Sequence, residues 1–170
     1  MDFAQLAKER YSVRKFQDKK IEKELLEQVI YAGRVSPTAC NNQPQKVYVL
    51  ESDAALEKLK KCTTCHFNAP AALLICYDKN ISWKRSFDGE DSGWVDASIV
   101  TTHMMLQAHE LGLGTTWVMY FDPAAAIREF ALPENIIPVA ILPIGYPAQD
   151  AEPSANHFKL REEAGTIIHI

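Results

Sequence analysis

The pattern with the clearest chemical meaning lies near the N-terminus, where Arg10, Ser12 and Arg14 alternate in the segment ERYSVRKF. Alternate residues of an extended chain point the same way, so these three side chains can face one ligand. Guanidinium groups bind phosphate oxygens through paired hydrogen bonds, and a serine hydroxyl can add another. The pattern therefore indicates an anion-binding segment, while a solvated basic surface is the alternative that spacing alone leaves open.

A second basic pair, Lys159 and Arg161, has the same alternate spacing near the opposite end of the chain. A solvated tail is again an alternative, but two clusters that converged on one phosphate would offset its charge of about −2. The chain as a whole is acidic, with 22 Asp and Glu against 18 Lys and Arg and a net charge of −4. That balance argues against a nucleic-acid or membrane-surface partner, so any anion site is expected to be local.

Cys62, Cys65 and His66 form the pattern CxxCH, which is the attachment signature of c-type haem. Cys40, Cys76 or a further histidine could also complete a zinc site around these residues. Redox-active pairs usually lie at the start of a helix, where the thiol pKa is lowered, whereas this pair follows a predicted helix. A metal- or haem-binding module is therefore one alternative function, beside the simpler interpretation as unreactive thiols.

Other catalytic and nucleotide-binding motifs are missing from the sequence. No GxGxxG follows a predicted strand and no GxxxxGK[ST] occurs, so the two commonest phosphate loops are not expected. Neither HExxH nor a Ser/His/Asp arrangement indicates a hydrolase. Asp96 and His103 lie two turns apart on a predicted helix, where His103 is expected to be a hydrogen-bonded core residue.

The length of 170 residues fits one domain spanning 1–170, which is large enough to bury a real core. The N-terminus lacks the long apolar run of a secretory signal, and no segment approaches the roughly 20 apolar residues of a membrane span. We therefore expect a cytoplasmic protein whose four cysteines are mostly thiols.

Hydrophobic periodicity divides the chain into helices and strands that do not alternate strictly. It predicts helices at 2–9, 21–34, 53–62, 94–112 and 122–132, and strands at 46–52, 71–77, 115–119, 139–145 and 166–170. The run at 71–77 is continuously apolar, which is typical of a strand buried on both faces. The helix at 94–112 is apolar nearly all round, so we expect it in the core or under a partner.

The segments RYSVRKF (10–16) and SPTACNNQPQ (36–45), taken together, resemble the nitroreductase family of flavoproteins. GLGTTWVMYFD (112–122), PIGYP (143–147) and the Lys159–Arg161 pair resemble later family segments in the same order. The resemblance implies an α+β fold with a central mixed, mainly antiparallel sheet flanked by helices. It also implies a homodimer that exchanges its C-terminal strand and holds two FMN molecules at the interface.

The resemblance further implies which positions bind the cofactor. Residues from the two chain ends would hold the phosphate, the ribityl chain and the pyrimidine edge of the flavin: Arg10, Tyr11, Ser12, Arg14, Lys159 and Arg161. Residues of the second subunit would reach the flavin ring: Pro37, Thr38, Ala39 and Asn41. The backbone around Val118 and Met119 would donate toward N5 of the flavin.

The function implied is reduction of an electron-poor small molecule, such as a nitroaromatic compound or a quinone, by NADH or NADPH through FMN in a ping-pong cycle. The flavin carries such chemistry itself, so no catalytic side chain and no metal ligand is expected. A flavin dehalogenase or another specialised reductase, and a flavin-binding protein without turnover, are the alternatives on the same fold.

Overall fold

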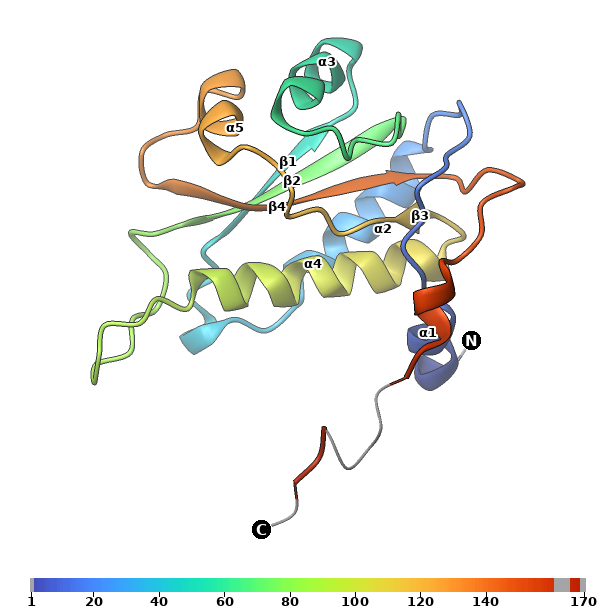
Figure 1. The fold of residues 1–170 in the computed structure, drawn as a ribbon. Helices are drawn as coiled ribbons and strands as arrows, with labels where there is room; N and C mark the ends of the chain where they lie inside the picture. Colours follow the sequence, from blue (N-terminus) through green and yellow to red (C-terminus); the bar gives the residue numbers. More distant parts are fainter. Residues whose placement is uncertain (1, 161–165, 169–170) are drawn as a thin grey trace.

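The structure is a computed structural model that describes residues 2–160 and 166–168. Its centre is an antiparallel sheet of four strands in the order β1-β2-β4-β3 (Figure 1). The strands are β1 (Gln45–Leu50), β2 (Ala71–Asp78), β3 (Gly114–Thr115) and β4 (Ile136–Gly145). The expected α+β fold with a mainly antiparallel sheet is confirmed.

Helices cover both faces of this sheet (Figure 1). Two pack on one face, α2 (Lys23–Arg34) and α4 (Gly93–Glu110), and two lie on the other, α3 (Asp53–Cys62) and α5 (Pro123–Glu129). The short helix α1 (Phe3–Glu9) lies at the C-terminal end of α4, and 3₁₀ turns occur at Ala39–Asn41 and Ala155–Phe158. No helix in the described part of the chain combines the length and apolarity needed to cross a membrane.

Strand β2 shows why the sequence carries one uninterrupted apolar run. Successive side chains of a strand point to opposite faces. Leu73 and Ile75 accordingly pack in the cluster beneath α2 and α4, whereas Leu74 and Cys76 pack in the cluster on the α3 side. Every residue from 71 to 77 is buried, so the prediction of a strand covered on both faces is confirmed.

Side-chain contacts define the start of α3 and the buried side of α4. Ser52 caps α3, because its hydroxyl accepts the amide hydrogen of Ala55 at 3.2 Å. Helix α4 is buried on one side only, through residues such as Val100 and Met104 in the core. Its other side remains partly exposed, as Val95 shows, so the core covers only part of the apolar surface of this helix.

Strand β3 is much shorter than the predicted strand at 115–119. The pairing with β4 continues beyond Thr115, where Thr116 donates to the carbonyl of Pro143 at 3.3 Å. Pro143 has no amide hydrogen to return a bond, so the ladder is interrupted there. Pairing resumes only as an isolated bridge between Val118 and Ile141.

The described part of the segment predicted as a strand at 166–170 is not a strand. Residues 166–168 form no strand, and residues 169–170 lie outside the described residues. Ile168 is 82% exposed. Exchange of a C-terminal strand with a second subunit therefore stays a prediction.

Candidate functional site

The segment that carries the N-terminal arginines is an extended strap between β3 and residues 146–151. Ser12 forms a parallel bridge with Thr115, and Val13 donates to the Thr115 carbonyl at 2.9 Å. On the other side, Ala148 donates to the carbonyl of Lys15 at 3.0 Å. The extended backbone that the alternating pattern requires is therefore present.

Gly114 makes this close approach possible. A Cβ atom at this position would lie 2.6 Å from Cγ2 of Val13, closer than packed carbon atoms approach. The hydroxyl of Thr116 also donates to the Val13 carbonyl. Gly114 in β3 and the hydroxyl of Thr116, one residue after this strand, thus fix the strap against the sheet edge.

Arg10 lies at the C-terminal end of α1, where its backbone amide donates to the Leu6 carbonyl at 3.1 Å. Its side chain is half-buried, and this burial lowers the pKa of the guanidinium. Within residues 2–160 and 166–168, no acidic side chain forms an ion pair with it. A half-buried cation without a counter-charge is the arrangement that an anionic ligand would complete.

The charge of Arg10 also affects its surroundings. The pKa of His109 on α4 is lowered, first by burial and then by the nearby Arg10 charge. Arg14 is exposed and donates to the carbonyl of Ser12 at 3.3 Å, so its guanidinium folds back along the strap. Arg10 and Arg14 therefore differ in burial, since Arg10 is half-buried and Arg14 is exposed.

The C-terminal tail approaches the same strap. The Tyr11 hydroxyl donates to the carbonyl of Ala151 at 3.2 Å, and its ring meets the His157 ring edge-on at a centroid distance of 6.3 Å. Lys15 adds an ion pair with Asp150 at 2.6 Å. Figure 1 shows the 3₁₀ turn that holds His157 at the same end of the molecule as α1.

These contacts bring the segment that precedes Lys159 to the strap. Lys159 follows the 3₁₀ turn directly and is exposed, whereas Arg161 lies outside the described residues. His157, two residues before Lys159, therefore lies against Tyr11, the neighbour of Arg10. Joint binding of one phosphate by both segments stays a prediction.

The loop that carries Pro37, Thr38, Ala39 and Asn41 lies at the other end of α4. The Ala39 amide donates to Oδ1 of Asp96, in the first turn of α4, at 2.8 Å. His109, near Arg10, lies in the last turn of the same helix. At about 1.5 Å per residue, the stretch of helix between Asp96 and His109 is about 20 Å long. One chain therefore does not bring this loop to Arg10, and Figure 1 shows the loop and α1 at opposite ends of α4.

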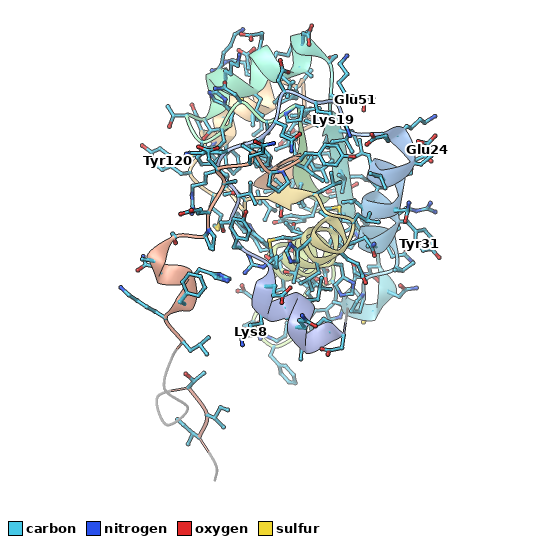
Figure 2. The ribbon with its side chains drawn as sticks, turned by 90° about the vertical axis from the view of Figure 1, so that its right-hand side faces the viewer. Lys8, Lys19, Glu24, Tyr31, Glu51 and Tyr120 are labelled. Atoms are coloured by element: carbon cyan, nitrogen blue, oxygen red, sulfur yellow. The ribbon has the colours of Figure 1, made fainter. Side chains whose placement is uncertain are left out.

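Val118 and Met119 differ in what their backbones offer. The amide and carbonyl of Val118 each bond to Ile141 at 2.9 Å, so the Val118 amide is already used. The Met119 amide has no partner among the described residues, and its side chain is 60% exposed. Tyr120, which follows, also lies at the surface (Figure 2). Of the two expected backbone donors, Met119 is the one with a free N–H.

The CxxCH segment forms hydrogen bonds to the residues that follow Met119. The Thr63 hydroxyl donates to the Tyr120 carbonyl at 2.5 Å, and the Asp122 amide donates to the Cys62 carbonyl at 2.8 Å. Burial raises the pKa of the Cys62 thiol, which makes it a poor nucleophile. Sequence spacing alone did not indicate this supporting role, because the partners lie some 57 residues away along the chain.

No metal site is built around these residues in the part of the chain that the structure describes. Among those residues, no group of three or more His, Cys, Asp or Glu side chains is placed to hold a metal ion. His66 instead accepts the Asn68 amide at its Nδ1 atom, at 3.0 Å. His103 and Asp96 do not pair either, since Asp96 bonds to Ala39 and Ser92.

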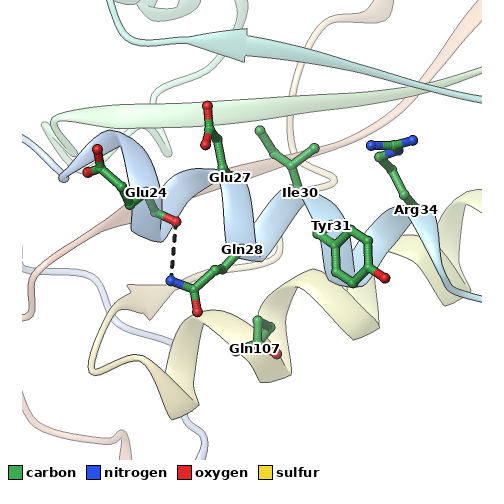
Figure 3. Close-up of a pocket in the computed structure, with 7 residues that line it drawn as sticks. All are labelled: Glu24, Glu27, Gln28, Ile30, Tyr31, Arg34 and Gln107. Atoms are coloured by element: carbon green, nitrogen blue, oxygen red, sulfur yellow. Dashed lines mark hydrogen bonds between the residues drawn. The ribbon is translucent and has the colours of Figure 1, made fainter.

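A groove of about 710 Å³ runs between α2 and α4, but none of the predicted site residues lines it (Figure 3). Its walls are formed by Glu24, Glu27, Gln28, Ile30, Tyr31, Arg34 and Gln107. Its lining carries two carboxylates and one guanidinium, which sum to a net negative charge, so the groove would repel a phosphate dianion. The groove is therefore not the anion site that the sequence predicts.

The exposed side of α4 carries large apolar side chains among small polar ones. A shallow depression of about 450 Å³ is lined by Trp94, Val95, Ser98, Ile99, Thr102 and His103. These residues recur at helical spacing, so they form one continuous stripe along the helix. The stripe runs between the two separated parts of the candidate site, from the Ala39 loop toward Arg10.

Comparison with known proteins decides the family. The model of the Nitroreductase family matches residues 7–72 and 63–146. The chain belongs to the nitroreductase family. A relative from Methanothermobacter thermautotrophicus, provisionally named NADH dehydrogenase/NAD(P)H nitroreductase, is 32% identical over 158 residues, which are 88% of this chain and 80% of the relative.

Solved structures agree with this assignment. A nitroreductase family protein from Clostridium difficile 630 is 45% identical, with a TM-score of 0.92, and the match covers 99% of this chain and 98% of that chain. An FMN-dependent nitroreductase from Clostridium difficile R20291 is 26% identical, with a TM-score of 0.80 and 96% of each chain covered. The nitroreductase fold expected from the sequence is therefore confirmed over nearly the whole chain.

One contact near the strap predicts how stability depends on pH. The Tyr146 hydroxyl donates to Glu22, whose other oxygen pairs with Lys19 at 3.1 Å. The Tyr146 bond is the largest of the contacts that lower the pKa of Glu22 from 4.5 to about 2. The ionised carboxylate therefore stabilises the fold above about pH 4.5, and this contribution is lost as the pH falls toward 2.

We expect the melting temperature of the wild-type protein to fall more steeply between pH 4.5 and pH 2 than that of Glu22→Gln, which cannot titrate there. Thermal unfolding followed by circular dichroism at several pH values measures both slopes. Parallel slopes would show that Glu22 does not secure residues 19–22 to Tyr146.

Proposed function

We propose that this nitroreductase-family protein is an FMN-dependent oxidoreductase that uses NADH or NADPH to reduce an electron-poor small molecule, such as a nitroaromatic compound or a quinone. The observation that carries the proposal is Arg10, a half-buried cation that has no acidic partner among the described residues. Related proteins bear the names FMN-dependent nitroreductase and NAD(P)H nitroreductase, which agree with it.

The groups available along the strap suit FMN. Arg10 and the Ser12 hydroxyl would bind the phosphate or the ribityl chain, and Lys159 and Arg161 would complete the phosphate site. Arg14 would approach the pyrimidine edge of the flavin, where a cation stabilises the negative charge that reduction places there. The Met119 amide, which has no partner among the described residues, would donate toward N5.

FMN, when bound, would supply the chemistry by accepting a hydride equivalent from the nicotinamide and passing electrons to the acceptor. The chain contributes placement and charge, which agrees with the lack of an acid–base constellation in the sequence. Met119 and Tyr120 are exposed beside the expected flavin edge, where they would restrict how an acceptor lies against the ring.

The proposal includes a homodimer in a cytoplasmic protein of one domain. Within one chain, a span of about 20 Å of α4 separates the Ala39 loop from Arg10, so a single copy offers only part of a flavin site. The apolar stripe on α4 lies between these two parts. A second copy packed on the stripe by two-fold symmetry would bring its own Ala39 loop toward the first copy's Arg10.

The test is to titrate FMN into the purified full chain, follow quenching of flavin fluorescence, and then assay oxidation of NADH and NADPH with nitroaromatic and quinone acceptors. The proposal predicts a saturable site and acceptor-dependent turnover. Absence of saturable FMN binding would reject it, and binding without turnover would leave a flavin-binding protein that is not an enzyme.

A Cys62→Ala/Cys65→Ala variant separates the flavin function from a metal or haem function. The proposal expects FMN affinity to stay within about threefold of the wild type, because it assigns neither thiol a flavin contact and the Cys62 thiol bonds to the Lys58 carbonyl within α3. Metal content measured on the same two preparations provides the contrast. Stoichiometric metal in the wild type that disappears in the variant would favour the metal-binding alternative.

A further inference from the structure

Asp96 is a buried carboxylate to which the sequence assigned no contact with the proposed flavin site. Only 2% of its surface is exposed, and it lies in the first turn of α4. Both of its oxygens are used: Oδ1 accepts the Ala39 amide at 2.8 Å, and Oδ2 accepts the Ser92 hydroxyl at 2.7 Å. The N-terminal end of a helix also favours a negative charge, so a carboxylate is stable at this position.

The loop held by Asp96 has a strained backbone. Cys40, Asn41 and Gln43 adopt left-handed conformations with φ values of 50°, 54° and 50°. Such conformations are unfavourable for a residue with a side chain, and they persist where surrounding contacts impose them. Inside the loop, the Thr38 hydroxyl accepts the Gln43 amide at 3.0 Å. The bond from Ala39 to Asp96 then fixes this preformed turn to α4.

The same carboxylate connects a second segment to the loop. Ser92 ends the irregular stretch between β2 and α4, and its backbone amide donates to the Trp83 carbonyl at 2.9 Å. Near the start of that stretch, the Asn42 side chain donates to the Ile81 carbonyl at 3.0 Å. Asp96 is therefore the point at which the Ala39 loop, the segment 81–92 and α4 are joined.

We propose that Asp96 is a positioning residue that holds the Ala39 loop in the shape needed to contact the flavin of the second subunit. The inference rests on the proposed function, since it concerns how that site is built. Without the carboxylate, the Ala39 amide loses its acceptor, and the left-handed residues that follow lose the contact that fixes the turn to α4. Loosening the loop then weakens flavin binding although Asp96 itself touches no cofactor.

The central variants are Asp96→Ala and Asp96→Asn. Alanine removes both hydrogen bonds, whereas asparagine can accept from Ala39 through Oδ1 and donate to the Ser92 hydroxyl through its amide. We expect Asp96→Ala to raise the Kd for FMN about tenfold or more and Asp96→Asn to raise it less than about threefold. Amide exchange of residues 37–43, measured by mass spectrometry, should accelerate in Asp96→Ala and remain near wild type in Asp96→Asn.

Thr101→Val is the matched control. Thr101 is fully buried on the same helix and donates to the Ala97 carbonyl at 2.7 Å, but it makes no bond to the loop. The variant should lower the melting temperature without raising the Kd for FMN by more than about threefold. A loss of affinity equal to that of Asp96→Ala would show a general stability effect and would overturn the inference.

Ser92→Ala replaces Asp96→Ala if the latter does not fold. It frees one carboxylate oxygen, and it should raise the Kd for FMN about threefold and speed amide exchange in residues 37–43. Unchanged affinity and exchange would overturn the positioning role. If the wild-type protein itself fails to bind FMN, the proposed function fails; if it binds FMN and Asp96→Ala binds equally well, only this inference fails.

Discussion

Arg10→Ala should raise the Kd for FMN about 10- to 100-fold. Hydrogen bonds between charged groups contribute about 1.5–3 kcal/mol each, and the guanidinium is half-buried, where a phosphate contact is less screened than at the surface. Removing it should not leave an acidic side chain unpaired, since no ion pair involves it among the described residues. Fluorescence titration with FMN measures the affinity, and thermal unfolding without FMN measures stability separately.

Arg128→Ala is the control for this change. Arg128 lies on α5, is exposed, and donates only to the Ala124 carbonyl at 3.5 Å within the described structure. Its removal lowers the net charge by the same amount, so FMN affinity should change less than about twofold. Arg10→Lys should lie between Arg10→Ala and the wild type, because lysine keeps the charge but loses the paired geometry. Equal affinities of Arg10→Ala and the wild type would remove Arg10 from the phosphate site.

Val95→Asp should convert the protein to a monomer and abolish measurable FMN binding. Val95 is 61% exposed in the single chain, so an aspartate there should be tolerated by the fold itself. In the proposed dimer the same position is covered, and an unpaired buried charge costs several kcal/mol. Loss of the interface also removes the second subunit's Ala39 loop from the flavin. Light scattering gives the mass, and FMN titration on the same sample gives the affinity.

Ile127→Asp provides the matched control for the interface. Ile127 is 40% exposed and lies on α5, on the opposite face of the sheet from α4 (Figure 1). This substitution should leave the protein dimeric with FMN affinity within about threefold of wild type. A dimeric Val95→Asp protein that binds FMN normally would contradict the proposed interface, and a monomeric one that binds normally would contradict a shared site.

Elements that depend on local sequence pattern could be predicted from the sequence. The continuous apolar run of β2 and the largely apolar helix α4 are encoded within single segments, and both elements are confirmed. The length of β3 was overestimated because Pro143, far along the chain, interrupts its ladder. Boundaries that depend on a partner strand cannot be read from the strand alone.

The site shows the same division. Arg10 and Ser12 could be proposed as anion-binding residues from the sequence, because side-chain type and alternate spacing are properties of a short segment. Two other features depend on tertiary pairing and could not be predicted from short segments. The Val118 amide bonds to Ile141, and the Thr63 hydroxyl donates to the Tyr120 carbonyl. Asp96 gave a weak signal, a charged residue on an otherwise apolar helix face, which could have indicated a buried hydrogen-bonded partner.

The central claim is that each flavin site takes Arg10 from one copy and the Ala39 loop from another. The direct measurement uses heterodimers, purified through two different affinity tags after co-expression, that pair an Arg10→Ala chain with a chain carrying Pro37→Asp and Asn41→Asp. Both loop positions are exposed in the single chain, so the fold should tolerate the added charges. Each parent homodimer is expected to bind FMN at least about tenfold more weakly than wild type.

In the heterodimer, one site combines both defects, whereas the other combines an intact Arg10 with an intact loop. The account predicts one FMN per dimer bound with wild-type affinity, measured by fluorescence titration against protein concentration. A heterodimer with no site of wild-type affinity would contradict it, because that result requires Arg10 and the Ala39 loop of the same chain to act together.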